Sequence, residues 1–245
     1  MRRAVVAVLI GFSIPPAGLG REFRFHHLHL AEGLEFYSRL FDPAVTQRAR
    51  VAGFDALRSG TMLLLFGRPS TSQSMPERPS AIWHFGWGDV TLGETYLRHA
   101  SREVEWEPPL PAGKLHLHLQ SPSPVTTAGW YRDMLGAAID VLPGTAASHP
   151  VAPRPELRVA EAAVRFGDFA MGIHRTDEAL VSTRGQRADH IAFECEELDR
   201  LISGLRDRGV PILESISPFG DGRHATIEGP DHIAIELVES DSHRH

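Results

Sequence analysis

Leucine and histidine alternate in the stretch LHLHL around His116 and His118. Because successive side chains of a strand point to opposite faces, this pattern predicts a strand with its leucines on one face and both imidazoles on the other. A Pro/Ser turn follows, and then an amphipathic segment with Thr126 or Thr127 as its N-cap and Gly136 as its stop. The pattern predicts a strand, a turn and a helix, in this order.

The same unit begins at three other places. His27 opens the stretch HLHL and is followed by a second helical pattern, while His84 lies in IWHFGW and His190 in ADHIAF. After the helix, each unit continues with patterns for further strands, except that the second unit is abbreviated. Repetition at roughly 35–65 residues means that the units bury one another's faces. Two such units would form a curved sheet with helices outside and a cup inside.

Composition narrows the classes of partner. A formal net charge of −6 and a pI near 6.1 argue against nucleic acid or an anionic membrane. Cys195 is the only cysteine, which excludes an intrachain disulfide and a thiolate cluster. Fourteen histidines are the unusual component, and neutral imidazole is the commonest metal ligand.

The first 20 residues have the layout of a secretory signal peptide. Two arginines precede an apolar run over residues 4–14, and glycines stand at −3 and −1 from a cleavage point before Arg21. We therefore predict that residues 1–20 are removed and that the protein is exported, to the periplasm or outside the cell. The run is too short to span a bilayer, so we expect no membrane span in the mature chain. If the segment is a mis-assigned start or a first strand, the protein is cytoplasmic.

Three stretches resemble the vicinal oxygen chelate superfamily, which includes glyoxalase I, bleomycin-resistance proteins and extradiol dioxygenases. They read HLHLQSPSP with WYRDMLG, DHIAFE, and ATIEGPDHIAIELVE, and the resemblance covers about residues 23–240. It implies an α+β fold of tandem βαβββ modules that form two cupped mixed sheets with helices outside. It also implies an N-terminal domain over residues 21–112 without a complete metal site, and a C-terminal domain over residues 113–245 that carries one.

The resemblance implies ligands by position. His116 and His190 stand on the first strands of the third and fourth modules, and Glu236 stands on the closing strand of the fourth. Gly172 takes the place where glyoxalase-type members have a glutamate. The first half fills the corresponding positions with His27, Leu65 and His84, and so lacks a carboxylate.

Two imidazoles and a carboxylate leave positions open on one divalent metal ion. This set favours Fe(II), with Mn(II) or Zn(II) as alternatives, and lets a substrate chelate through adjacent oxygens. We predict that His118 and His224 move protons and that His174 and Arg223 contact the substrate. Where extradiol enzymes place a tyrosine, this chain has Thr226.

The predicted function is that of a metal-dependent enzyme, either a dioxygenase or an isomerase/lyase, acting on a small molecule. The alternative is a metal-free protein of the bleomycin-resistance kind that sequesters a small molecule in its cup. The sequence leaves open the substrate, the identity of the metal and whether the chain forms a homodimer.

Overall fold

The computed structural model describes residues 23–41, 43–44, 46–60, 62–68, 73, 78–87, 95–97, 115–140 and 160–240. The predicted signal peptide, residues 1–20, lies outside the described residues.

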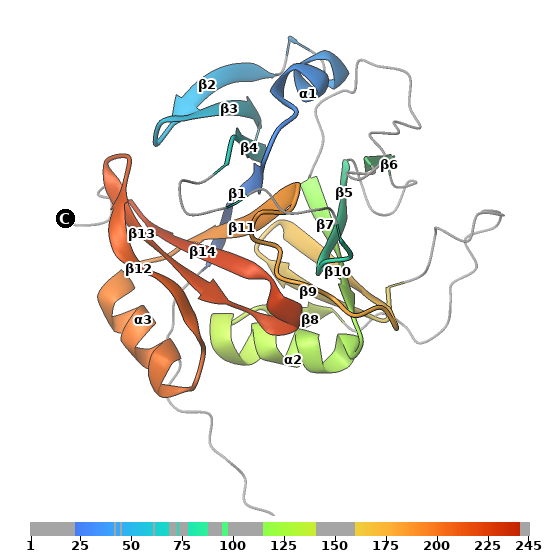
Figure 1. Ribbon diagram of the computed structural model, residues 1–245, viewed down its shortest axis with the longest axis vertical. Coiled ribbons are helices and arrows are strands. Elements are labelled where there is room, and N and C mark those ends of the chain that lie inside the picture. Colours follow the sequence, from blue (N-terminus) through green and yellow to red (C-terminus); the bar gives the residue numbers. More distant parts are fainter. Residues whose placement is uncertain are drawn as a thin grey trace, which may run out of the picture.

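An eight-stranded sheet joins the first and the fourth modules (Figure 1). The first module supplies β1 (Arg24–Leu30), α1 (Leu34–Leu40), β2 (Gln47–Val51), β3 (Phe54–Ser59) and β4 (Met62–Phe66). The fourth supplies β11 (Ala188–Glu194), α3 (Leu198–Asp207), β12 (Ile212–Phe219), β13 (Gly222–Glu228), a 3-10 turn (Pro230–His232) and β14 (Ala234–Glu239). The strand order is β12-β13-β14-β11-β1-β4-β3-β2, and β1 runs antiparallel to β11 in the middle of the sheet.

A six-stranded sheet joins the second and the third modules. The second module contributes β5 (Ile82–Trp87) and β6 (Thr95–Leu97). The third contributes β7 (Leu115–Ser121), α2 (Pro124–Leu135), β8 (Ala138–Asp140), β9 (Ala162–Phe166) and β10 (Phe169–Arg175). The strand order is β6-β5-β7-β10-β9-β8.

The predicted fold class is confirmed, since two mixed sheets are built from strand–helix–strand modules. The pairing of the modules differs from the expected one, in which the third and fourth modules would pair within residues 113–245. Instead, the hydrogen bonds of β1 go to β11 and β4, and those of β7 go to β5 and β10. In the described part of the chain, the eight-stranded sheet takes four strands from each of its two modules, whereas the six-stranded sheet takes four from the third module and two from the second.

The leucines of the alternating stretches face one shared core. Leu28 and Leu30 of β1 and Leu117 of β7 are fully buried in the same apolar cluster. Between the sheets, Phe25 stacks on Phe169 with ring centroids 4.0 Å apart. Because side chains alternate along a strand, the histidines of each sheet point to its other face. The fold therefore offers two separate histidine-lined surfaces, one on each sheet.

Local sequence sets the ends of α2. Gly136 adopts a left-handed conformation at φ 69° and ends the helix, as predicted. The predicted N-cap at Thr126 or Thr127 is wrong, because the helix begins at Pro124 with Ser123 as its N-cap. Proline suits the first helical turn, where its missing N–H is not needed. The Thr127 hydroxyl instead donates to Asp231, at 2.9 Å.

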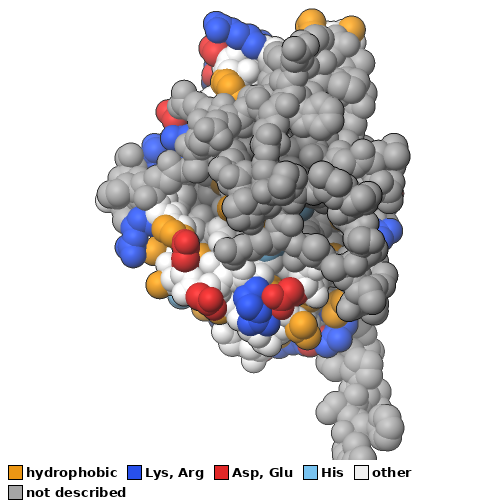
Figure 2. All heavy atoms as spheres, turned by 90° about the vertical axis from the view of Figure 1, so that its right-hand side faces the viewer, with side chains coloured by type: hydrophobic (Ala, Val, Ile, Leu, Met, Phe, Trp, Pro, Cys, Tyr) orange, Lys and Arg blue, Asp and Glu red, His pale blue; other side chains and the backbone are white. Residues whose placement is uncertain are grey.

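The helices lie at opposite ends of the molecule. In Figure 1, α1 lies at the top beside β2 and β3, and α2 and α3 lie at the bottom. On the face shown in Figure 2, acidic and basic side chains are mixed over the described surface. None of the described helices combines the length and apolar composition that a membrane crossing needs.

Candidate metal centre

Strand register shows which positions of the modules are equivalent. Opposite pairs on the opening and closing strands are His29 with Leu65, His118 with Gly172, and Ala192 with Glu236. In each pair, the first residue lies two positions after the module's first histidine. Leu65, Gly172 and Glu236 are therefore equivalent, which agrees with the positions inferred from the resemblance.

The eight-stranded sheet brings His27, His190 and Glu236 together. The Oε2 atom of Glu236 lies 3.1 Å from Nε2 of His27 and 3.4 Å from Nε2 of His190. All three side chains are buried, with at most 7% of each residue exposed. His29 joins this group, because one ring nitrogen from each of His27, His29 and His190 lies within 4.8 Å of the others.

The outward nitrogens of these rings are held by neighbours. His190 donates from Nδ1 to Oδ1 of Asp189 at 2.8 Å, and His29 donates from Nε2 to the carbonyl oxygen of Gly67 at 2.7 Å. Nδ1 of His27 shares a hydrogen bond of 2.7 Å with Nδ1 of His26. Such outer partners fix the tautomer of an imidazole and leave its other nitrogen as a ligand. None of these partners could be predicted from the sequence pattern.

The second carboxylate oxygen of Glu236, Oε1, accepts a hydrogen bond. His224 donates from Nδ1 to Oε1 of Glu236, so that Oε2 remains directed toward His27 and His190. The ring of Phe219 stacks on His27 at 5.9 Å between centroids. A small apolar cluster on the same face contains Leu65, Ala192, Phe219 and Val238. The carboxylate is therefore held by His224 and lies beside a small apolar cluster.

Burial and the carboxylate of Glu236 determine the protonation states of the histidines in this cup. Burial lowers the pKa of His27 to about 3 and that of His29 to about 4. Burial would also lower the pKa of His190, but its bonds to Asp189 and Glu236 raise that pKa to about 9. The bonds from the histidines outweigh burial at Glu236 and hold its pKa well below the usual range. The site therefore pairs an ionised carboxylate with imidazoles, and a divalent cation would replace the proton on His190.

A family model for the Glyoxalase/Bleomycin resistance protein/Dioxygenase superfamily matches residues 113–237. The chain belongs to this superfamily. Two mutant forms of glyoxalase I from Zea mays are similar in structure, each at 11% sequence identity. Their TM-scores are 0.53 and 0.50, and the alignments cover 90% and 89% of this chain and 93% and 94% of theirs. At this identity the likeness shows the glyoxalase fold alone.

Shorter members of the superfamily align with about half of the chain. A mutant of the fosfomycin resistance protein FosX from Listeria monocytogenes, complexed with Mn(II), is 18% identical at a TM-score of 0.38. That alignment covers 50% of this chain and 88% of FosX. No curated protein sequence matches the chain.

Two of the three predicted metal ligands lie together in the eight-stranded sheet, and the third lies in the other sheet. His190 and Glu236 lie together, whereas His116 lies on β7 in the six-stranded sheet, as does His118. His27, which the sequence placed in a half without a complete site, takes the third position because β1 is the neighbour of β11. The HLHL stretch that begins at His27 is identical to the one at His116, and it was the sequence feature that could have indicated a ligand at His27.

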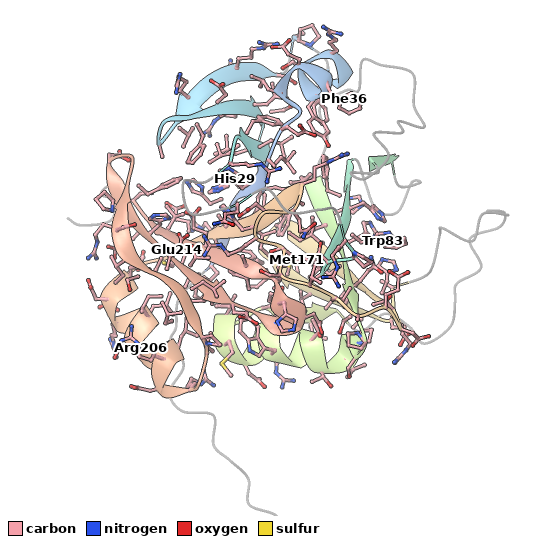
Figure 3. The ribbon with its side chains drawn as sticks, in the orientation of Figure 1. His29, Phe36, Trp83, Met171, Arg206 and Glu214 are labelled. Atoms are coloured by element: carbon pink, nitrogen blue, oxygen red, sulfur yellow. The ribbon has the colours of Figure 1, made fainter. Side chains whose placement is uncertain are left out.

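The remaining predicted site residues have other surroundings. His174 lies on β10 of the six-stranded sheet, beside His118. Arg223 pairs with Asp199 at 2.8 Å and with Glu239, at the edge of the fourth module. In Figure 3, the labelled His29 lies near the middle of the molecule, while Trp83 and Met171 lie on the six-stranded sheet to its right. The structure thus separates the predicted residues into two groups, one on each sheet.

Proposed function

We propose that His27, His190 and Glu236 hold one divalent metal ion, and that the protein is a metal-dependent enzyme acting on a small molecule. The observation that carries this proposal is the approach of two Nε2 atoms to one oxygen of Glu236, at 3.1 and 3.4 Å. Atoms this close in a buried cup are arranged as neighbouring ligands of one ion. The held outer nitrogens support the same reading, because they fix the ring orientations.

Two imidazoles and one carboxylate suit Fe(II), with Mn(II) and Zn(II) as alternatives. A bound ion would polarise a substrate that chelates it through two adjacent oxygens. The protein supplies the rest of the site. His224 fixes the carboxylate through its bond to Glu236, and the apolar cluster around Phe219 excludes water.

His29 is the residue best placed to accept a proton from a bound substrate. Its Nε2 atom donates to the carbonyl of Gly67, so its Nδ1 atom is an acceptor. Burial keeps the ring neutral, with a pKa of about 4. In this proposal His29 takes the role that the sequence assigned to His118 and His224, because His118 lies on the other sheet and His224 is bonded to Glu236.

The position of Thr226 favours an isomerase or lyase over a ring-cleaving dioxygenase. Thr226 faces Glu236 across β13 and β14, and its hydroxyl donates to Glu214 at 3.2 Å. The resemblance places a tyrosine here in extradiol enzymes, and the fourth module contains none. The two-histidine, one-carboxylate set keeps oxygen-dependent cleavage as the second candidate.

Metal analysis of protein purified without chelators tests the proposal. We expect one equivalent of metal bound in this cup, lost with EDTA and lost in Glu236→Gln. Glu228→Gln is the matched control, because Glu228 also bonds a histidine, His232, at 2.7 Å in the same hairpin but on the rim. Failure of the wild-type protein to retain or rebind any metal would favour the metal-free sequestering protein.

Substrate panels then separate the reaction classes. Protein loaded anaerobically with Fe(II) is given catechols, and oxygen uptake is followed. A panel of hydroxy-carbonyl compounds is assayed in parallel without oxygen. Turnover that does not consume oxygen is expected for the isomerase or lyase, and both activities should disappear in Glu236→Gln.

A further inference from the structure

The six-stranded sheet carries a second histidine cluster. It contains His84 of β5, His116 and His118 of β7, and His174 of β10. Each residue is at most 4% exposed. The four imidazoles therefore form one buried cluster on this sheet.

Strand register relates this cluster to the metal centre of the other sheet. Across β1 and β11, His27 faces Ala192 and His29 faces His190. Across β5 and β7, His84 faces His118 and Gly86 faces His116.

The two antiparallel strand pairs therefore match residue for residue. His84 is equivalent to His27, and His116 is equivalent to His190. The second sheet repeats both histidine positions of the first metal centre.

The carboxylate of the first centre has no counterpart in the second, since Gly172 is equivalent to Glu236. Two additional imidazoles lie next to Gly172. A Cβ atom built on Gly172 would lie 3.5 Å from Nδ1 of His118 and 3.6 Å from Nε2 of His174. These two nitrogens are 2.7 Å apart and share a hydrogen bond. A side chain at position 172 would therefore begin in contact with both imidazoles.

The other two rings pack around His118. The ring of His84 stacks on it with centroids 4.4 Å apart and planes at 15°, and the ring of His116 lies 5.0 Å away. Trp83 contacts His84 and His174 by its edge, at 4.4 and 5.1 Å.

We propose that His84, His116, His118 and His174 form a second metal site, with nitrogen ligands only, for a late first-row ion such as Zn(II). The four imidazole nitrogens would hold the ion, which would take the place of the proton shared by His118 and His174. Imidazole suits Zn(II), Cu(II) and Ni(II), whereas Mn(II) prefers carboxylate and water. The two cups therefore differ in the metals that they select.

Titration of the metal-free protein with Zn(II) and with Mn(II) separates the two sites. We expect two equivalents of tightly bound Zn(II) but one of Mn(II) for the wild-type chain. His118→Ala with His174→Ala should remove one Zn(II) and leave the Mn(II) site unchanged. Glu236→Gln should remove the Mn(II) site and retain one Zn(II).

Two controls exclude adventitious binding. His232→Ala removes a surface histidine that is bonded to Glu228, and a His243→Ala/His245→Ala variant removes two histidines at the end of the sequence. Both variants should keep two equivalents of Zn(II). Loss of one equivalent in either of them would assign the second Zn(II) to the surface and overturn the proposal.

The number of Zn(II) ions bound by the wild-type chain can be measured even if a variant fails to fold. A single Zn(II) equivalent in the wild-type chain that persists in the His118→Ala/His174→Ala variant would contradict the second site, whereas a single equivalent that is lost in this variant would count against the first. X-ray absorption on the Zn(II) retained by Glu236→Gln gives an independent measurement. A shell made only of imidazole nitrogens is expected, and a shell containing carboxylate oxygen would contradict the assignment.

Discussion

Asp189 connects the turn before β11 to the proposed metal ligand His190. One carboxylate oxygen accepts the backbone N–H of Gly185 at 2.6 Å, and the other accepts Nδ1–H of His190 at 2.8 Å. Asp189 is 2% exposed, so both bonds are protected from water. This carboxylate therefore orients the imidazole and strengthens Nε2 as a donor toward a metal.

Asp189→Asn should weaken metal binding without abolishing it. The amide oxygen can still accept the hydrogen bond from His190, but the negative charge is lost. We expect the affinity for Mn(II) to fall by about 10–100-fold, as is usual when an outer partner of a ligand is changed. Competition with a chelator measures the affinity, and Asp133→Asn, in an exposed pair with Arg132, is the control. Equal affinities for the two variants would count against this role.

At the scale of the element, β1 has two functions. It lies between β11 and β4, its leucines face the shared core, and His27 and His29 face the cup. Because side chains alternate, each function takes every second residue. A defect on one face should therefore alter stability, and a defect on the other should alter metal binding.

Leu28→Ala tests the core face of β1. Leu28 is fully buried, and deletion of a buried leucine side chain costs about 2–5 kcal/mol in the free energy of unfolding. Urea unfolding of the two proteins measures this difference. Val125→Ala, at a residue 71% exposed, should change the free energy by less than about 0.5 kcal/mol. A loss below about 1 kcal/mol for Leu28→Ala would show that β1 is less tightly packed than the structure indicates.

The sequence predicted the elements and their faces better than the pairing of the strands. Period two identified β1 and β7 and the side on which their histidines lie, since this depends only on neighbouring residues. The choice between His27 and His116 as partner of His190 depends on which strand bonds to β11. Both histidines begin the same HLHL stretch, so local pattern cannot distinguish them.

At the scale of the whole molecule, the eight-stranded sheet joins segments far apart in the chain. β1 begins at Arg24 and β14 ends at Glu239, and the proposed ligands His27 and Glu236 from these two strands lie side by side. Binding of a metal to this cup should therefore stabilise the fold as a whole. The titration of the same groups should set the pH dependence of the metal-free protein.

Metal-free protein should be most stable near pH 6.5. The pKa of His27 is about 3 and that of His29 about 4, so below pH 6.5 the unfolded chain binds protons that the folded chain does not. Stability therefore falls as the pH drops. His190, with a folded pKa of about 9, contributes stability that is complete below pH 6.5 and is lost as the pH rises through 9.

Urea unfolding of EDTA-treated protein at about pH 5, 6.5 and 9 checks this expectation. His27→Leu is the informative variant, because it removes a group that stays neutral in the fold. Its acid slope should be shallower by up to about 1.4 kcal/mol per pH unit. A steady rise in stability from pH 5 to pH 9 would contradict the predicted maximum.

The most direct test of the metal centre is the stoichiometry of Mn(II) binding in His27→Ala and His116→Ala, measured by electron paramagnetic resonance of free Mn(II). These residues begin identical stretches, but only His27 lies beside Glu236. We predict that His27→Ala loses the bound Mn(II) and that His116→Ala retains one equivalent. Loss of Mn(II) in His116→Ala, with retention in His27→Ala, would contradict the account.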